Sequence, residues 1–309
     1  MTAAIELRGL AKHYGEVRAL DSVDLVVEEG AVFGFLGPNG AGKTTALRLL
    51  NGLARPSAGS ARIFGHAAGS PEARDVVGFL PDVPGFYEWM TAAEYLRFAG
   101  GLFGLQGEGL EERVSVLLQM AGLAGITTRL GGFSRGMKQR LGVAQALVNA
   151  PRLLMLDEPT SALDPLGRRD VLDMIASLKG RTTVFFSTHI LSDVERVCDT
   201  VAVLDHGAIV AHGPIEELKA RYAAHRIVVE VTDGAEGLAE SVGAQAWATS
   251  VQRDGQTLRV SVSDTREAGR ALPALLTAAG LTLVRVEPGE IDLEEVFVDL
   301  VGQSTGGQR

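Results

Sequence analysis

Cysteine is almost absent from this chain of 309 residues, in which Cys198 stands alone. A single thiol excludes an internal disulfide framework and is typical of proteins kept in a reducing compartment. Long apolar runs are also missing, since no uncharged stretch approaches the ~20 residues that a membrane-spanning helix needs. The first residues show no basic segment followed by an apolar one, so no signal peptide is predicted. We therefore expect a cytoplasmic protein that reaches a membrane only through a partner.

Net positive charge is lacking too. Asp and Glu number 38 against 29 Lys and Arg, which gives a formal net charge of -9. This balance argues against electrostatic attraction to nucleic acid or anionic lipid, so no nucleic-acid partner is expected. Hydrophobic residues make up 46% of the chain and charged residues 22%, which is the composition of a globular protein. The length favours two domains over one.

The first part of the chain alternates short apolar runs with helical patterns. Near-continuous apolar runs are typical of parallel strands that are covered on both faces. Thr91 and Glu94 form a capping box that opens one helix, and Ser70 precedes a proline in the first turn of another. Between about residues 82 and 134 the pattern is almost wholly helical, which predicts a helical lobe beside the sheet. The predicted strands are Ala31–Leu36, Val76–Leu80, Leu153–Leu156, Thr183–Phe186 and Thr200–Leu204.

Beyond Gly213 and Pro214 a last helix is predicted to about Ala220, and the pattern of elements then changes. Asp254 and Gly255 form a hairpin turn between two strands. The elements follow the order β-α-β-β-α-β, which is the split arrangement of ferredoxin-like domains. They are strand Arg226–Val231, helix Gly234–Val242, strands Ala246–Arg253 and Thr257–Val262, helix Arg266–Ala279, strand Leu281–Glu287 and a short helix near Leu293–Val301.

A glycine-rich segment gives the sharpest functional signal. It matches GxxxxGK[ST] between an apolar strand and a helix that begins near Lys43, and this context disfavours a chance match in a turn. Glycines let the backbone wrap around phosphate oxygens, where successive amides and a helix N-terminus present positive dipoles. Lys43 can reach the β- and γ-phosphates of a nucleotide, and the Thr44 hydroxyl can ligate Mg²⁺. The expected nucleotide-binding residues are Gly37, Pro38, Asn39, Gly40, Ala41, Gly42, Lys43, Thr44 and Thr45.

Two adjacent carboxylates follow the apolar run at residues 153–156. Open α/β sheets bind their ligands at the C-terminal ends of the strands, where Asp157 and Glu158 stand. An Asp-Glu pair alone is usually a solvated turn, but downstream of a phosphate-binding loop it becomes a candidate catalytic pair. Asp157 is placed to hold Mg²⁺ through water, and Glu158 is placed to polarise an attacking water. These two motifs leave several NTPase classes open, including kinases and GTPases.

Three further segments decide between those classes. Phe133–Leu141 reads FSRGMKQRL just upstream of the acidic strand, Pro159–Asp164 reads PTSALD after Glu158, and Ser187–His189 reads STH at the end of the next strand. In this order they resemble the signature, D-loop and switch-histidine motifs of the ABC ATPases over about residues 4–220. No guanine-reading Asn-Lys-x-Asp sequence is present, which disfavours a GTPase. The resemblance implies an α/β P-loop NTPase core with an antiparallel β part and a helical lobe at about 82–150.

The resemblance also implies roles for single residues. Ser134 and Gly136 would bind the γ-phosphate of ATP held by a second ATPase domain, and Asp164 would cross the same interface. Two domains, expected to be two copies of one chain, would therefore sandwich two ATP molecules. His189 would contact the γ-phosphate near the attacking water. Tyr14 is similar to the aromatic residue that stacks on adenine, although a tyrosine in a surface turn is the alternative.

The signature departs from the family pattern, which reads Leu-Ser-Gly-Gly-Gln. Phe133, Arg135 and Met137 replace three of those residues, whereas Ser134 and Gly136, the expected phosphate contacts, remain. The expected cross-protomer contact with ATP is therefore kept.

A second departure lies in the loop where the family supplies a glutamine. The loop reads Leu-Pro-Asp, and Asp82 occupies the aligned place. An aspartate is a capable Mg²⁺ ligand, but it brings a negative charge near the γ-phosphate. Two roles for Asp82 stay open, one in the metal shell and one in communication with a membrane partner.

The domains expected from these patterns are an ATPase domain at 1–221 and a small α+β ferredoxin-like domain at 222–309. The signature, the Leu-Pro-Asp loop and the C-terminal domain together resemble the separate ATPase subunits of bacterial exporters of drugs, antibiotics or sodium. Such a subunit would drive an integral-membrane permease. A non-transport ABC ATPase of translation or DNA repair is one alternative, disfavoured by the single motif set. An ABC importer subunit is the other.

Overall fold

The computed structural model describes residues 3–223, 226–289 and 293–297. It divides into two compact units, Met1–Pro214 and Ile215–Arg309. Helix α8 (Ile215–Ala223) therefore belongs to the second unit. The division between the units lies seven residues before the boundary expected from the sequence. Within the described ranges, no helix is both long and apolar enough to cross a membrane.

A six-stranded sheet forms the centre of the first unit, with strand order β10-β9-β3-β8-β7-β6. Five of these strands run parallel, and β10 pairs antiparallel with β9 at the edge. Their bounds are β3 Val32–Leu36, β6 Val77–Leu80, β7 Leu153–Asp157, β8 Thr183–Thr188, β9 Thr200–Asp205 and β10 Ala208–Pro214. Strands β3, β7 and β8 are buried along their whole length. The five strands predicted from apolar runs are thus confirmed.

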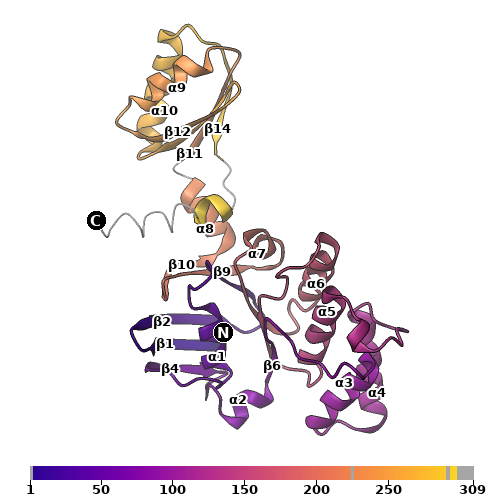
Figure 1. The fold of residues 1–309 in the computed structure, drawn as a ribbon. Coiled ribbons are helices and arrows are strands. Elements are labelled where there is room, and N and C mark those ends of the chain that lie inside the picture. The colour runs from indigo at the N-terminus through magenta and orange to yellow at the C-terminus, as the bar shows by residue number, and fades with distance from the viewer. Residues whose placement is uncertain (1–2, 224–225, 290–292, 298–309) are drawn as a thin grey trace. The chain divides into compact units, whose positions relative to one another are not determined.

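A second, antiparallel sheet lies beside the first, with strand order β2-β1-β4-β5. Its strands are β1 Ala3–Tyr14, β2 Val17–Glu28, β4 Ala58–Ile63 and β5 His66–Ala67, and the first three are seen side by side in Figure 1. Helix α1 (Lys43–Leu50) shares one core with both sheets, in which Leu47 packs with Leu25 and Phe185. This core anchors the start of α1, where the glycine-rich loop ends.

Two of the remaining helices of this unit begin at the residues that the caps predict. Ser70 caps α2 (Pro71–Asp75), and Thr91 and Glu94 form the predicted capping box of α3 (Ala92–Leu102). Helices α4 (Gly107–Met120) and α5 (Arg135–Ala146) complete the helical lobe, which contains α3 and α4 close together in Figure 1. Helices α6 (Pro165–Ser177) and α7 (Leu191–Val197) follow β7 and β8.

The second unit has the predicted β-α-β-β-α-β order after α8. The strands form one antiparallel sheet in the order β12-β13-β11-β14, and α9 and α10 share a core with its buried face. The elements are β11 Arg226–Val231, α9 Ala235–Gly243, β12 Ala248–Asp254, β13 Thr257–Val262, α10 Thr265–Ala278 and β14 Leu283–Pro288. Residues 293–297 are helical, and the rest of the predicted last helix lies outside the described residues.

Candidate functional site

A cavity of about 640 Å³ opens at the C-terminal ends of the parallel strands. It brings together the glycine-rich loop, the loops after β6, β7 and β8, and the turn between β9 and β10. This is the edge at which open α/β sheets bind ligands. The residues that line it are Val17, Arg18, Ala19, Asn39, Gly40, Gly42, Lys43, Thr44, Thr45, Asp82, Glu158, Ser161, His189 and His206.

The glycine-rich loop has a backbone that only glycine tolerates at two of its positions. Gly42, which caps α1, has a φ of 112°, and a Cβ there would lie 2.3 Å from the carbonyl oxygen of Ala19. A Cβ on Gly37 would lie 2.4 Å from the carbonyl oxygen of Leu204. Side chains at these positions would collide with backbone, so glycine is what lets the loop pass this close to Ala19 and Leu204.

Lys43, Glu158 and His189 form a connected group on the floor of the cavity. The Lys43 ammonium donates to the carbonyl oxygen of Gly37 at 2.7 Å and lies 3.1 Å from Glu158 Oε1. His189 Nδ1 lies 2.9 Å from Glu158 Oε2. Because an ionised carboxylate can only accept, the histidine donates through Nδ1 in this contact. Both Glu158 oxygens are therefore held in place.

Backbone geometry also fixes Glu158. Its φ is 49°, a left-handed value that costs a non-glycine residue free energy and is common at functional sites. The Glu158 amide donates to the carbonyl oxygen of Ser187 on the neighbouring strand at 3.1 Å. The chain therefore turns sharply after β7 and presents the Glu158 carboxylate to the cavity.

Asp157 lies beneath this group and is almost fully buried. Its Oδ1 accepts from Ser187 Oγ at 2.7 Å and from Thr44 Oγ1 at 3.2 Å. Burial raises the pKa of Asp157, the two hydroxyl hydrogen bonds oppose that rise, and the charges of Asp82 and Glu158 add to it. Three carboxylates and two hydroxyl groups thus lie close together beside the cavity.

These oxygen ligands and positively charged groups suit a Mg²⁺–nucleotide complex. The Thr44 hydroxyl and the Asp157 carboxylate, 3.2 Å apart, are the hard oxygen ligands that Mg²⁺ prefers. Lys43 and the loop amides offer positive charge and hydrogen-bond donors to phosphates. Asp82 lies near enough to raise the pKa of Asp157 and lines the same cavity. The sequence-predicted loop residues, Asp157, Glu158, His189 and Asp82 are therefore brought together.

Ser134, Gly136 and Asp164 lie together in a different place. Ser134 caps α5 and accepts from the Met137 amide at 3.2 Å, and Asp164 caps α6 and accepts from the Gly167 amide at 3.1 Å. A Cβ on Gly136 would lie 3.7 Å from the Cα of Gly167, so the two helix starts are neighbours. The cavity around Lys43 is lined by other residues.

Comparisons with known proteins identify the family. A family model described as ABC transporter matches residues 20–161, and one described as ATP-binding protein DrrA1-3-like, C-terminal domain, matches residues 213–301. The ABC transporter ATP-binding protein YxlF of Bacillus subtilis, named as uncharacterized, is 39% identical over 298 residues, covering 96% of this chain and 99% of its own. This chain belongs to the ABC transporter ATP-binding proteins. It is an ATPase with a P-loop NTPase core, as the motifs predict.

A relative whose name states a function and a solved structure both agree with this assignment. The daunorubicin/doxorubicin resistance ATP-binding protein of Streptomyces peucetius is 37% identical over 310 residues, covering 97% of this chain and 93% of its own. The dimeric structure of an ATP-binding cassette in a post-hydrolysis state with ADP and Pi matches with a TM-score of 0.61 and 26% identity. That match covers 68% of this chain and 98% of the other. ATP is accordingly the nucleotide of this ABC ATPase.

Tyr14, the expected adenine platform, lies at the end of β1 on the surface. Its side chain is 47% exposed, and the Lys12 ammonium lies 4.8 Å from the centroid of its ring. Val17, Arg18 and Ala19, which follow the same turn, line the cavity. The turn is thus beside the site of the ABC ATPase, and an aromatic face with a neighbouring cation is available there.

Five cavity residues were not predicted from the sequence, namely Val17, Arg18, Ala19, Ser161 and His206. Ser161 stands in the Pro159–Asp164 motif, where it was given no role, and the other four belong to no motif. His206 lies in the hairpin turn between β9 and β10, across which Asp205 pairs with Ala208. The signal available for His206 was its position directly after an apolar run that reads as a parallel strand, since such strands end at the ligand edge.

Proposed function

We propose that this chain is the motor of a membrane exporter, in which two ATPase domains close around two ATP molecules and drive a separate permease. Support for export comes from two relatives, whose names describe daunorubicin/doxorubicin resistance and bacitracin transport. Support for pairing comes from the dimeric cassette whose fold this chain shares. The subunit would lie at the inner face of the cell membrane, held there by the permease.

The observation that carries the hydrolytic role is the group of Lys43, Glu158 and His189. Glu158 acts as the general base and takes a proton from the attacking water. His189, through the 2.9 Å contact of Nδ1, keeps that carboxylate oriented. Lys43 neutralises phosphate charge that develops during transfer. Thr44 and Asp157, with Asp82 as a further candidate, would hold a Mg²⁺ ion that neutralises charge on the β- and γ-phosphates.

Pairing follows from where the signature lies. Ser134, Gly136 and Asp164 stand at two adjacent helix starts, away from the cavity that holds Lys43. Helix N-termini attract anions, so this surface suits the γ-phosphate of ATP bound by a second chain. Each chain then completes the site of its partner. We propose a homodimer, because one chain carries both halves of the site.

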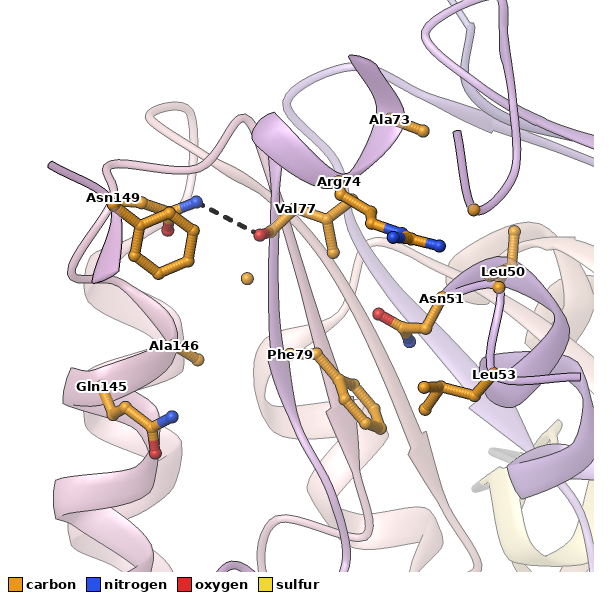
Figure 2. Close-up of a pocket in the computed structure, with 14 residues that line it drawn as sticks. Leu50, Asn51, Leu53, Ala73, Arg74, Val77, Phe79, Gln145, Ala146 and Asn149 are labelled. Atoms are coloured by element: carbon orange, nitrogen blue, oxygen red, sulfur yellow. Dashed lines mark hydrogen bonds between the residues drawn. The ribbon is translucent and has the colours of Figure 1, made fainter. Parts of the chain in front are cut away.

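The permease would dock in a second cavity, of about 580 Å³. Its lining is mainly apolar, and Figure 2 shows the ring of Phe79 pointing toward Leu53, with Asn149 Nδ2 donating to the carbonyl oxygen of Val77 at 3.3 Å. A short helix with an apolar face fits such a groove. The lining residues are Leu50, Asn51, Gly52, Leu53, Gly69, Ala73, Arg74, Val77, Gly78, Phe79, Phe103, Gln145, Ala146 and Asn149.

Strand β6 connects this docking cavity to the nucleotide cavity. Val77 and Phe79 of β6 line the docking cavity, and Asp82, three residues after Phe79, lines the nucleotide cavity. A permease segment bound against β6 would therefore move Asp82 relative to Asp157. This supports a role for Asp82 in communication with the permease.

The substitution Glu158→Gln tests the hydrolytic assignment. The amide keeps the shape of the side chain but cannot take up the proton of water. Turnover is expected to fall by on the order of 10²–10⁴-fold while ATP binding persists. Steady-state phosphate release and binding of a fluorescent ATP analogue measure the two properties, with the exposed Glu112→Gln on α4 as a matched control. Parental hydrolysis by Glu158→Gln would remove Glu158 as the base.

The same variant tests the pairing. Because Glu158→Gln holds ATP without cleaving it, the purified chain is expected to form an ATP-dependent dimer, visible by light scattering. Adding Ser134→Arg places a bulky cation at the start of α5 and is expected to abolish that dimer without loss of ATP binding. Dimers that persist in the double variant would contradict the cross-protomer role of Ser134.

A further inference from the structure

Asp193 is a carboxylate with no solvent exposure that lies outside the nucleotide cavity. It stands on α7, four residues after His189. No motif in the sequence includes it. A buried charge is costly unless it is paired and hydrogen-bonded, so its partners show why it is there.

Two side chains satisfy the Asp193 carboxylate. Thr160 Oγ1 donates to Oδ2 at 2.5 Å, and Arg168 Nε donates to Oδ1 at 2.5 Å. Arg168 also donates through Nη2 to Ser192 Oγ at 2.7 Å, so the guanidinium grips the start of α7 at two points. Both carboxylate oxygens are therefore occupied by donors from other segments.

Each of these segments carries a residue of the ATPase site. Thr160 lies two residues after Glu158, and Asp193 lies four residues after His189. Arg168 lies one turn after Asp164 on α6, and its amide donates to the carbonyl oxygen of Asp164 at 2.9 Å. Asp193 thus joins, at one point, the chain segments of the base, the histidine and the residue at the dimer surface.

Such a network has few alternative arrangements. Breaking a buried ion pair leaves an uncompensated charge, whereas an apolar replacement of the whole set can be as stable. The charges are therefore not needed to fill this space, but they do fix the three segments relative to one another. A displacement of the start of α6 moves Arg168. Through the ion pair with Asp193, Arg168 then moves α7 as well.

We infer that Asp193 is a positioning residue that transmits the dimer contact of Asp164 to Glu158 and His189. When a partner chain meets Asp164, the Arg168–Asp193–Thr160 network sets His189 and Glu158 in their working positions. This inference rests on the proposed function, since it uses the roles of Glu158, His189 and Asp164 given above. It adds a reason why ATP turnover should require the partner chain beyond phosphate binding.

The same two helices provide a matched control. Arg196 of α7 donates to Asp173 of α6 at 2.8 Å, but both side chains are about half exposed. This second link between the helices lies far along α6 from Asp164 and includes none of Thr160, Arg168 and Asp193. Exposed pairs contribute little to stability. Asp173→Asn therefore removes an α6–α7 ion pair without disturbing the proposed relay.

The test compares Asp193→Asn with Asp173→Asn in the full chain. For Asp193→Asn, kcat is expected to fall by on the order of tenfold, the size of a typical coupling effect. KM for ATP should stay unchanged, and the Glu158→Gln form should still dimerise with ATP. Asp173→Asn should behave as the parent. Parental kcat in Asp193→Asn, or an equal loss in Asp173→Asn, would overturn the inference.

A double-mutant cycle separates transmission from a general structural role. If Asp164 acts through Asp193, the losses of kcat in Asp164→Ala and Asp193→Asn will not add, because both cut one relay. The losses in Asp164→Ala and Asp173→Asn will add. Full additivity with Asp193→Asn would overturn the relay.

Two further variants guard the test against misfolding. Thr160→Val removes one hydroxyl at constant shape and is expected to reproduce the loss of kcat, whereas Arg168→Lys keeps the charge and is expected to lose less. If Thr160→Val turns over like the parent, the network does not position Glu158. The failure of the proposed function itself is distinguishable, because it would appear as parental turnover in Glu158→Gln.

Discussion

In the proposed mechanism, Glu158 is kept inactive until the nucleotide arrives. Lys43 lies 3.1 Å from one carboxylate oxygen, and His189 lies 2.9 Å from the other. Lys43 is also the residue that we expect to bind the phosphates. A triphosphate that takes up the Lys43 ammonium therefore releases one oxygen of Glu158, which then becomes free to accept a proton from water. We therefore expect nucleotide binding and base activation to be coupled through one ion pair.

Asp157 is expected to lower the stability of the protein when no nucleotide is bound. Burial first of all, and then the charges of Asp82 and Glu158, raise its pKa above 3.8, the ordinary value for aspartate. The folded state thus binds this proton more tightly than the unfolded state does. Proton binding at Asp157 therefore stabilises the folded state at low pH, and this contribution is lost as the pH rises through the raised pKa.

The substitution Asp157→Asn is therefore expected to raise the melting temperature of the nucleotide-free protein at neutral pH. The gain should shrink as the pH falls, because the parent then protonates Asp157. Thermal melts over a pH series measure this, and ATP turnover should be lost in parallel with the Mg²⁺ ligand. A lower melting temperature at neutral pH would show that the hydrogen bonds to Asp157 outweigh the cost of its burial.

At the scale of elements, contiguous signals were predictable and distributed ones were not. The buried parallel strands follow from apolar runs, and the capping box at Thr91 fixed the start of α3. Strand β1 alternates less clearly, because register shifts on both sides of Leu10 break the period of two. Its sheet was expected only through the family resemblance.

The site divides in the same way. The phosphate loop and the Asp157–Glu158 pair are local motifs, whose meaning is set by neighbours in the sequence. The partners of Asp193 come from α6 and from the loop after β7, about 25 and 33 residues away along the chain. Only the packing of α6 against α7 brings them together, so no spacing in the sequence announces them.

Strand β6 and the end of α1 should act as one docking element for the permease. Leu53 lines the docking cavity with a side chain that is 68% exposed. Leu53→Glu would place a charge in the groove, which an apolar helix face cannot tolerate. Detergent co-purification from the native host is expected to lose the integral-membrane partner, while the melting temperature is unchanged.

Val116→Glu on α4 is the matched control for this docking test. Its side chain is 51% exposed, and it lines neither the docking cavity nor the nucleotide cavity. It should retain the membrane partner. Equal recovery of the partner with Leu53→Glu would place the docking surface elsewhere, and recovery of ribosomes or DNA would contradict the exporter.

At the scale of the whole molecule, each of the two units has a hydrophobic core of its own among the described residues. One contains Leu47 and Phe185, and the other contains Leu238 and Val260. A unit with its own core can unfold on its own, and the nucleotide cavity lies wholly within the first unit. We therefore expect two thermal transitions, of which ATP affects one.

Calorimetry of the Glu158→Gln chain with and without Mg²⁺–ATP measures this. At a ligand concentration of 100 Kd, binding adds about 2.7 kcal/mol to the unit that binds and nothing to the other. The transition of Met1–Pro214 should therefore move to higher temperature while that of Ile215–Arg309 stays in place. A single transition that moves as a whole would show that the units unfold together.

Fragments place the boundary between the units. A fragment of residues 1–214 should show the ATP-dependent transition alone, because α8 groups with the second unit. Fragment 1–221 adds most of α8, and the boundary expected from the sequence predicts that it melts higher than fragment 1–214. Equal melting temperatures of the two fragments would assign α8 to the C-terminal unit. The packing of α8 would then stabilise that unit and not the first one.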